Sequence, residues 1–109
     1  GAPLQQPREE VVEWAVGALG NLAEYGTDAA RRGIVEGGGL EPMARLLRNG
    51  QGLGQELAVF ALGALADNRH QGSVREQVAG CVEELRGVMN KLYEGRLRDR
   101  ALSLLRLAK

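Results

Sequence analysis

His70 and Cys81 have the side chains best suited to covalent or metal chemistry, since the chain has one histidine and one cysteine. A histidine activates a cysteine thiol only when the two side chains lie within hydrogen-bonding reach. His70 and Cys81 are eleven positions apart across a polar segment, and that separation defines no geometry between them. His70 also has no second histidine or cysteine nearby with which to bind a metal. We therefore predict a protein that is not an enzyme, with no catalytic residue, no metal and no cofactor.

Acidic pairs and a glycine-rich stretch are the other patterns that could suggest chemistry. Glu9-Glu10 and Glu83-Glu84 lie in helical sequence, where adjacent side chains diverge by about 100°. They are therefore expected to be solvated rather than paired for acid–base catalysis. The stretch EGGGLEP (36–42) lacks the Lys-Ser/Thr sequel and the preceding strand of a phosphate-binding loop. Its glycines are predicted to let two helices meet at a sharp angle.

The charge balance argues against several classes of partner. The 14 Lys+Arg and 14 Asp+Glu residues cancel, whereas binding to nucleic acid or an anionic membrane needs a cationic excess. No apolar run approaches the roughly 20 residues of a membrane span, and residues 1–10 lack the basic-then-apolar pattern of a signal peptide. A single cysteine suits a reducing compartment. We expect a cytoplasmic or nuclear location, no nucleic-acid partner and no membrane span.

Helical periodicity runs through the chain. Apolar residues recur at spacings of three and four, the period-two alternation of strands is absent, and glycine clusters separate the segments. The sequence therefore predicts an all-α protein. The predicted helices cover 7–25, 28–36, 40–48, 54–67 and 73–79, followed by one after Gly80 that carries Val82, Leu85, Val88, Met89 and Leu92, and a last one after Gly95.

One short helical motif occurs three times. AVGALGNLA (15–23) and AVFALGALA (58–66) share seven of nine residues at an offset of 43, and ALSLLRLAK (101–109) keeps the pattern another 43 residues on. Four apolar positions also recur 42 residues later: Leu40, Met43, Leu46 and Leu47 become Val82, Leu85, Val88 and Met89. A three-helix unit of this length does not cover its own apolar stripe, so neighbouring units are expected to stack and bury it.

These units resemble the armadillo repeat. GGLEPMARLLRNG (38–50) is similar to the family's glycine and second helix, and EWAVGALGNLAEYG (13–26) and ELAVFALGALADN (56–68) are similar to its third helix. The resemblance implies an all-α, right-handed α-solenoid of stacked three-helix repeats; another helix-pair repeat of similar period is the alternative. The expected units within the single domain 1–109 are a third helix (8–26) and two full repeats (27–68 and 69–109). This frame leaves both ends of the stack uncovered.

In the armadillo family the third helices line a concave face, where peptide-binding members place a Trp and, four residues later, an Asn. Asn21 matches the Asn, but Gly17 stands at the Trp position. The corresponding pairs in the next units are Phe60 with Ala64 and Ser103 with Leu107. The chain thus departs from the importin-alpha pattern, so binding of a nuclear localisation signal is not expected.

The resemblance nevertheless implies a non-enzymatic interaction module, or scaffold, that binds a peptide or helix of another protein on this face. The face is expected to be acidic over two units and basic at one end, which suits a partner with basic and apolar side chains. For Trp14 a role as a core or inter-repeat anchor is favoured over partner binding, because large aromatic side chains are mostly buried. Asn21 is expected to contact either a partner or the neighbouring repeat. Assembly or dimerisation through the exposed stack ends, giving a homo-oligomer, is the alternative function. The candidate partner-binding residues are Glu10, Trp14, Gly17, Asn21, Glu56, Phe60, Ala64, Asp67, Arg100 and Ser103.

Overall fold

The protein is all-helical over the residues that its computed structural model describes, 8–67, 69, 74–95 and 97–107, which contain no strand. The seven helices are α1 (Glu9–Tyr25), α2 (Asp28–Glu36), α3 (Leu40–Asn49), α4 (Leu53–Ala66), α5 (Val74–Glu84), α6 (Arg86–Tyr93) and α7 (Arg98–Leu107). The predicted all-α class is therefore confirmed for this part of the chain.

The first four helices begin and end close to the predicted positions, because local signals define their ends. Thr27 is the N-cap of α2, and its hydroxyl accepts a hydrogen bond of 3.1 Å from the amide of Ala30. Gly26 and Gly50 follow the last residues of α1 and α3, where each glycine amide bonds back to a helix carbonyl. Pro7 and Ser73, predicted at the first turns of two helices, lie outside the described residues.

The fifth helix is longer than predicted. The sequence indicates a break at Gly80, but α5 continues through Gly80 to Glu84, so Val82 lies on α5 and the chain turns at Leu85. In the first unit the break occurs at three consecutive glycines, 37–39, of which Gly38 has a φ of 89°. One glycine inside a helix costs only about 1 kcal/mol, and the fully buried Val82 offsets that cost by packing in the core.

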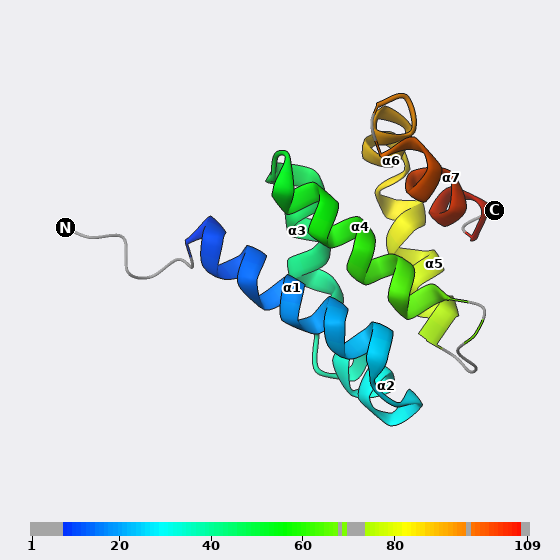
Figure 1. The fold of residues 1–109 in the computed structure, drawn as a ribbon. Helices are drawn as coiled ribbons and strands as arrows, with labels where there is room; N and C mark the ends of the chain where they lie inside the picture. Colours follow the sequence, from blue (N-terminus) through cyan, green and yellow to red (C-terminus); the bar gives the residue numbers. More distant parts are fainter. Residues whose placement is uncertain (1–7, 68, 70–73, 96, 108–109) are drawn as a thin grey trace.

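The three near-copies of the repeated motif pack in chain order. Helix α4 lies between α1 and α7 and contacts both, while α3 contacts α1 and α4 from behind in the view of Figure 1. Helices α5 and α6 pack against α7, and α2 and α3 contact α5. Helix α4 therefore buries its apolar side against neighbours from its own unit and from the units on both sides.

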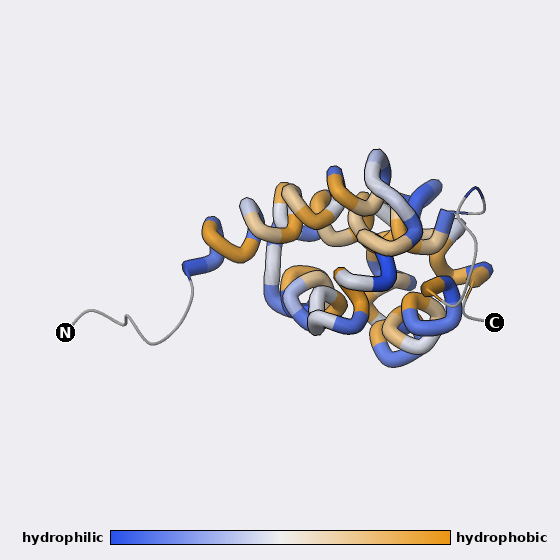
Figure 2. Tube along the Cα trace, turned by 90° about the horizontal axis from the view of Figure 1, so that it is seen from below, coloured by the Kyte–Doolittle hydropathy of each residue, from blue (hydrophilic) through white to orange (hydrophobic). Residues whose placement is uncertain are grey.

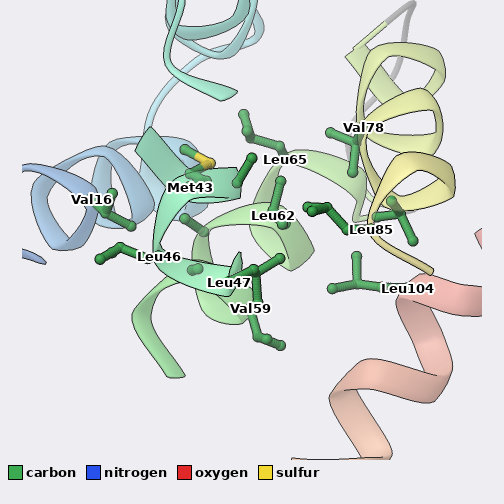
Figure 3. Packing of buried hydrophobic residues seen from close by; sticks show 14 of the residues in the cluster. Val16, Met43, Leu46, Leu47, Val59, Leu62, Leu65, Val78, Leu85 and Leu104 are labelled. Carbon is green, nitrogen blue, oxygen red and sulfur yellow. The ribbon is translucent and has the colours of Figure 1, made fainter. Parts of the chain in front are cut away.

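A single apolar core joins the units. Its fully buried large side chains include Met43, Leu46 and Leu47 from α3 and Leu62 and Leu65 from α4, and Figure 3 shows them meeting Val78, Leu85 and Leu104. Along the tube in Figure 2, hydrophobic and hydrophilic turns alternate. This alternation is the amphipathic pattern expected for helices that bury one side.

Helices α1 and α4 approach closely because α1 carries glycine at the contact. A Cβ atom on Gly20 would lie 2.7 Å from two ring carbons of Phe60 and 3.3 Å from Cβ of Ala61. Gly17 meets Leu57 at a looser 3.7 Å, measured from the same hypothetical Cβ position. Phe60 is therefore held from one side by α1, while α4 directs its other side toward α7.

The two ends of this row of helices differ, although the sequence predicts that both are uncovered. Four of the five exposed large apolar side chains among the described residues lie on α1: Val11 (46%), Trp14 (68%), Leu22 (46%) and Tyr25 (82%). On α7 the exposed side chains are instead polar: Arg98, Asp99, Arg100, Ser103 and Arg106. Trp14 is therefore not a core or inter-repeat anchor in the described structure, because no described helix covers the outer side of α1.

Candidate functional site

The α4–α7 groove is a pocket in the described residues with a volume of about 670 Å³. Helices α4 and α7 form its two walls, and α1 and α5 contribute one side chain each. Its lining residues are Glu24, Val59, Phe60, Gly63, Ala64, Ala66, Asp67, Arg75, Arg100, Ser103, Leu104, Arg106 and Leu107.

Five of the ten candidate residues line this groove. Phe60, Ala64 and Asp67 project from α4 and its C-cap at the three- and four-residue spacing of one helix face, and Arg100 and Ser103 face them from α7. The structure thus brings together residues that lie some 40 positions apart in sequence. Ala64 contributes little accessible surface, since it is only 4% exposed.

The other five candidates do not line the groove. Glu56 instead lines a smaller pocket of about 290 Å³, together with Leu97, Asp99 and Arg100. On α1, Glu10, Trp14 and Asn21 are exposed, and Gly17 is half-buried against Leu57. The predicted single ladder across all three long helices is therefore divided between the groove and the outer side of α1.

Arg69 neutralises the acidic rim of the groove. Its guanidinium donates hydrogen bonds of 2.7 Å to Glu24 and 2.8 Å to Asp67, and its backbone amide donates another of 2.8 Å to Asp67. These hydrogen bonds, to Asp67 first and then to Glu24, raise the pKa of Arg69 above its usual value, so it stays cationic. Both groove carboxylates therefore already have a cationic partner.

Three arginines in the groove have no such partner. Within the described part of the chain, Arg75, Arg100 and Arg106 make no hydrogen bond or ion pair, and Nε of Arg75 is buried without an acceptor. The groove therefore offers unpaired cationic groups, because Arg69 already pairs with both of its carboxylates. Glu10 and Glu56, from the part of the face expected to be acidic, do not line it. Buried or confined guanidinium groups favour carboxylate and phosphate partners, which they bind through two parallel hydrogen bonds.

Sequence reasoning missed Glu24, Arg69, Arg75 and Arg106. The repeat offers a signal for the last of these, since equivalent positions 43 apart hold Gly20, Gly63 and Arg106. Gly20 leaves space for Phe60 of α4 and a Cβ on Gly63 would meet no atom within 4 Å, whereas the arginine at the third position projects a charge into the groove. The ion pair between Arg69 and Glu24 had no such signal, because the two residues lie 45 positions apart.

Cys81 has the environment of an unreactive thiol. Burial, with a smaller contribution from Glu84, raises the pKa of its thiol above the usual value. A nucleophilic cysteine needs the opposite shift. His70 lies outside the described residues, so its geometry relative to Cys81 is not part of the structure.

We expect iodoacetamide to alkylate Cys81 of the folded chain at pH 8 at least tenfold more slowly than the same thiol in the urea-unfolded chain. The raised pKa lowers the thiolate fraction and the half-buried position hinders access. Intact-mass measurement over time gives both rates. Equal rates in the two states would contradict the inert role of this thiol.

The described residues contain neither a candidate metal site nor a candidate membrane-spanning helix. Over those residues, no three His, Cys, Asp or Glu side chains gather closely enough to hold a metal. None of the helices is both long and apolar enough to cross a membrane.

The α4–α7 groove is thus the feature from which a function can be argued. It combines an apolar floor with unpaired cationic groups in a hollow large enough to hold several side chains. Searches against family models, curated proteins and solved structures find no match for this chain, so its function must be inferred from its own residues.

Proposed function

We propose that this chain is a non-enzymatic protein–protein interaction module that binds an extended segment of another protein in the α4–α7 groove. We further propose that its helices form an armadillo-like, right-handed solenoid. The recurring motif and the packing of α4 between α1 and α7 support that arrangement. In such a stack the junction between two long helices offers a lengthwise channel for a partner.

The observation that carries the proposal is a set of unpaired cationic side chains in a groove with an apolar floor. Phe60, Leu104 and Leu107 supply apolar surface, and Arg75, Arg100 and Arg106 supply guanidinium groups without partners. A bound segment with apolar and acidic side chains would cover the first set and pair with the second. We therefore propose a partner segment with acidic side chains, instead of the basic segment expected from the sequence.

The helix geometry sets the spacing of the acidic groups. Arg100 and Arg106 are six positions apart on α7, a rise of about 9 Å. An extended peptide advances about 3.3 Å per residue and alternates its side chains between two faces, so carboxylates two residues apart, about 7 Å on one face, come nearest to this rise. The preferred segment is therefore extended, with two acidic residues at that spacing and an apolar residue near them for the floor at Phe60.

Selection from a random peptide-display library on the immobilised chain tests this proposal. We expect the enriched peptides to carry paired acidic residues two positions apart, because these lie on one face and reach both arginines. Arg106→Gln should then weaken a selected peptide at least tenfold, or about 1.4 kcal/mol, in a fluorescence-anisotropy titration. The affinity should also fall as salt is raised.

Arg98→Gln is the matched control, because Arg98 is an exposed arginine on the same helix that does not line the groove. It should leave the affinity within about twofold of the wild type. Enrichment of lysine- and arginine-rich peptides, or equal losses from Arg98→Gln and Arg106→Gln, would contradict the proposed site. Phe60→Ala adds an independent check on the apolar floor.

A further inference from the structure

The outer side of α1 carries an apolar stripe that no described helix covers. The stripe consists of Val11, Trp14, Ala15, Ala18, Leu22 and Tyr25, all of them exposed. These positions recur at three- and four-residue spacing and therefore share one helix face. We call this set the α1 outer face. None of its residues lines the α4–α7 groove.

The equivalent positions on α4 show what such a face normally does. Ala58, Ala61 and Leu65 lie 43 positions after Ala15, Ala18 and Leu22, and each of the three is fully buried in the core. The α1 outer face is thus an uncovered copy of a surface that the fold buries on α4. No described helix buries this apolar face, and an exposed apolar face of this kind is typical of an intermolecular contact.

The stripe is symmetric along the helix. Its large residues and its central alanine are at 11, 14, 18, 22 and 25, so the spacings 3, 4, 4, 3 are the same in both directions. If a twofold axis passes beside Ala18, an antiparallel second copy of α1 sets Trp14 opposite Leu22 and Val11 opposite Tyr25. The small central alanine lets the two helix backbones approach. Such self-complementarity is what a twofold interface requires.

We propose that the α1 outer face binds a second copy of this chain, forming a twofold dimer through antiparallel α1 helices. The zero net charge of the chain imposes no overall repulsion between copies. A head-to-tail arrangement is disfavoured, since the opposite end exposes Arg98, Asp99 and Arg106 rather than an apolar face.

The area available predicts a weak dimer. From their exposed fractions and the usual areas of such side chains, the four large residues of the face present about 500 Å² per copy. Two copies would bury about 1,000 Å² through these residues, near the lower limit for a specific interface. The dimer is therefore expected to dissociate in the micromolar range rather than the nanomolar range.

Sedimentation equilibrium and tryptophan fluorescence test this dimer together. Trp14 is the only tryptophan, so its emission reports directly on this face. From about 1 mM to about 1 µM protein, we expect the mass to fall from dimer to monomer and the emission to shift to longer wavelength at the same midpoint. A chain that stays monomeric throughout would overturn the proposal and leave the face to a different protein or a further helix. A dimer whose Trp14 emission does not change on dissociation would overturn it too.

Leu22→Glu keeps the fluorophore and places a charge against Trp14 of the second copy. We expect this variant to remain monomeric with long-wavelength emission at all these concentrations. Leu53→Glu is the matched control, because Leu53 is also an exposed leucine (60%, against 46% for Leu22) and lies on α4 outside this face. It should dimerise as the wild type does. Circular dichroism checks that both variants remain helical. Dimerisation that survives Leu22→Glu, or that is lost equally in both variants, would overturn the α1 interface.

Discussion

Leu62→Ala is expected to lower the free energy of unfolding by about 3–5 kcal/mol. Leu62 has no exposed surface and lies at the centre of the core, among Met43, Leu46, Leu47 and Leu65. Its removal leaves a cavity where α3, α4 and α5 converge (Figure 3). A domain of this size is stable by only about 5–15 kcal/mol, so this one substitution would remove a large share of the total. Urea unfolding followed by circular dichroism measures the loss.

Leu53→Ala provides the comparison within the same helix. Leu53 is 60% exposed at the start of α4, so its truncation removes little buried contact. We expect a loss of no more than about 0.5 kcal/mol. A loss from Leu62→Ala that is as small as this would show that the three near-copies of the motif do not share a packed core.

Arg31→Met is the second substitution with a large expected effect, a loss of about 2–4 kcal/mol. Arg31 is a charged side chain with only 5% exposure, and it lies beneath the C-terminal end of α1. Its guanidinium donates hydrogen bonds of 2.7 Å to the carbonyl of Ala23 and 3.1 Å to that of Gly26, and it also pairs with Asp28. Methionine keeps the apolar stem but leaves these helix-end carbonyls without a donor.

Arg32→Met is the matched control, because Arg32 is the next residue on α2 and is exposed. We expect it to change stability by less than about 0.5 kcal/mol. The same urea titration compares the two variants. If Arg31→Met were as mild as Arg32→Met, the buried guanidinium would not be what holds α1 to α2.

The two proposed contacts occupy different surfaces and respond to different substitutions. Arg106→Gln alters the α4–α7 groove and leaves the α1 outer face unchanged, whereas Leu22→Glu does the reverse. Peptide binding that fails while dimerisation persists would therefore remove only the groove proposal. Because Glu24 of α1 joins the groove rim through Arg69, the two surfaces share a helix but not a residue.

The sequence by itself determined the helices and their order. Spacings of three and four, the Thr27 cap and the glycines after the first and third helices are local signals, and each acts over a few residues. The offset of 43 also predicted that equivalent helices would be neighbours, since an apolar stripe must be covered by something. The one clear error in the helices, the break expected at Gly80, arose because a single glycine is a weak breaker when flanking valines are buried.

Only the tertiary structure decided which charges remain available. Glu24, Asp67 and Arg69 come from three units, and their pairing leaves the other arginines of the groove as its available charges. The side of α1 that stays uncovered was likewise decided by packing, which buries Leu65 but leaves its counterpart Leu22 exposed. Ion pairs and burial depend on contacts between residues more than 40 positions apart, and no local pattern encodes the distance between them.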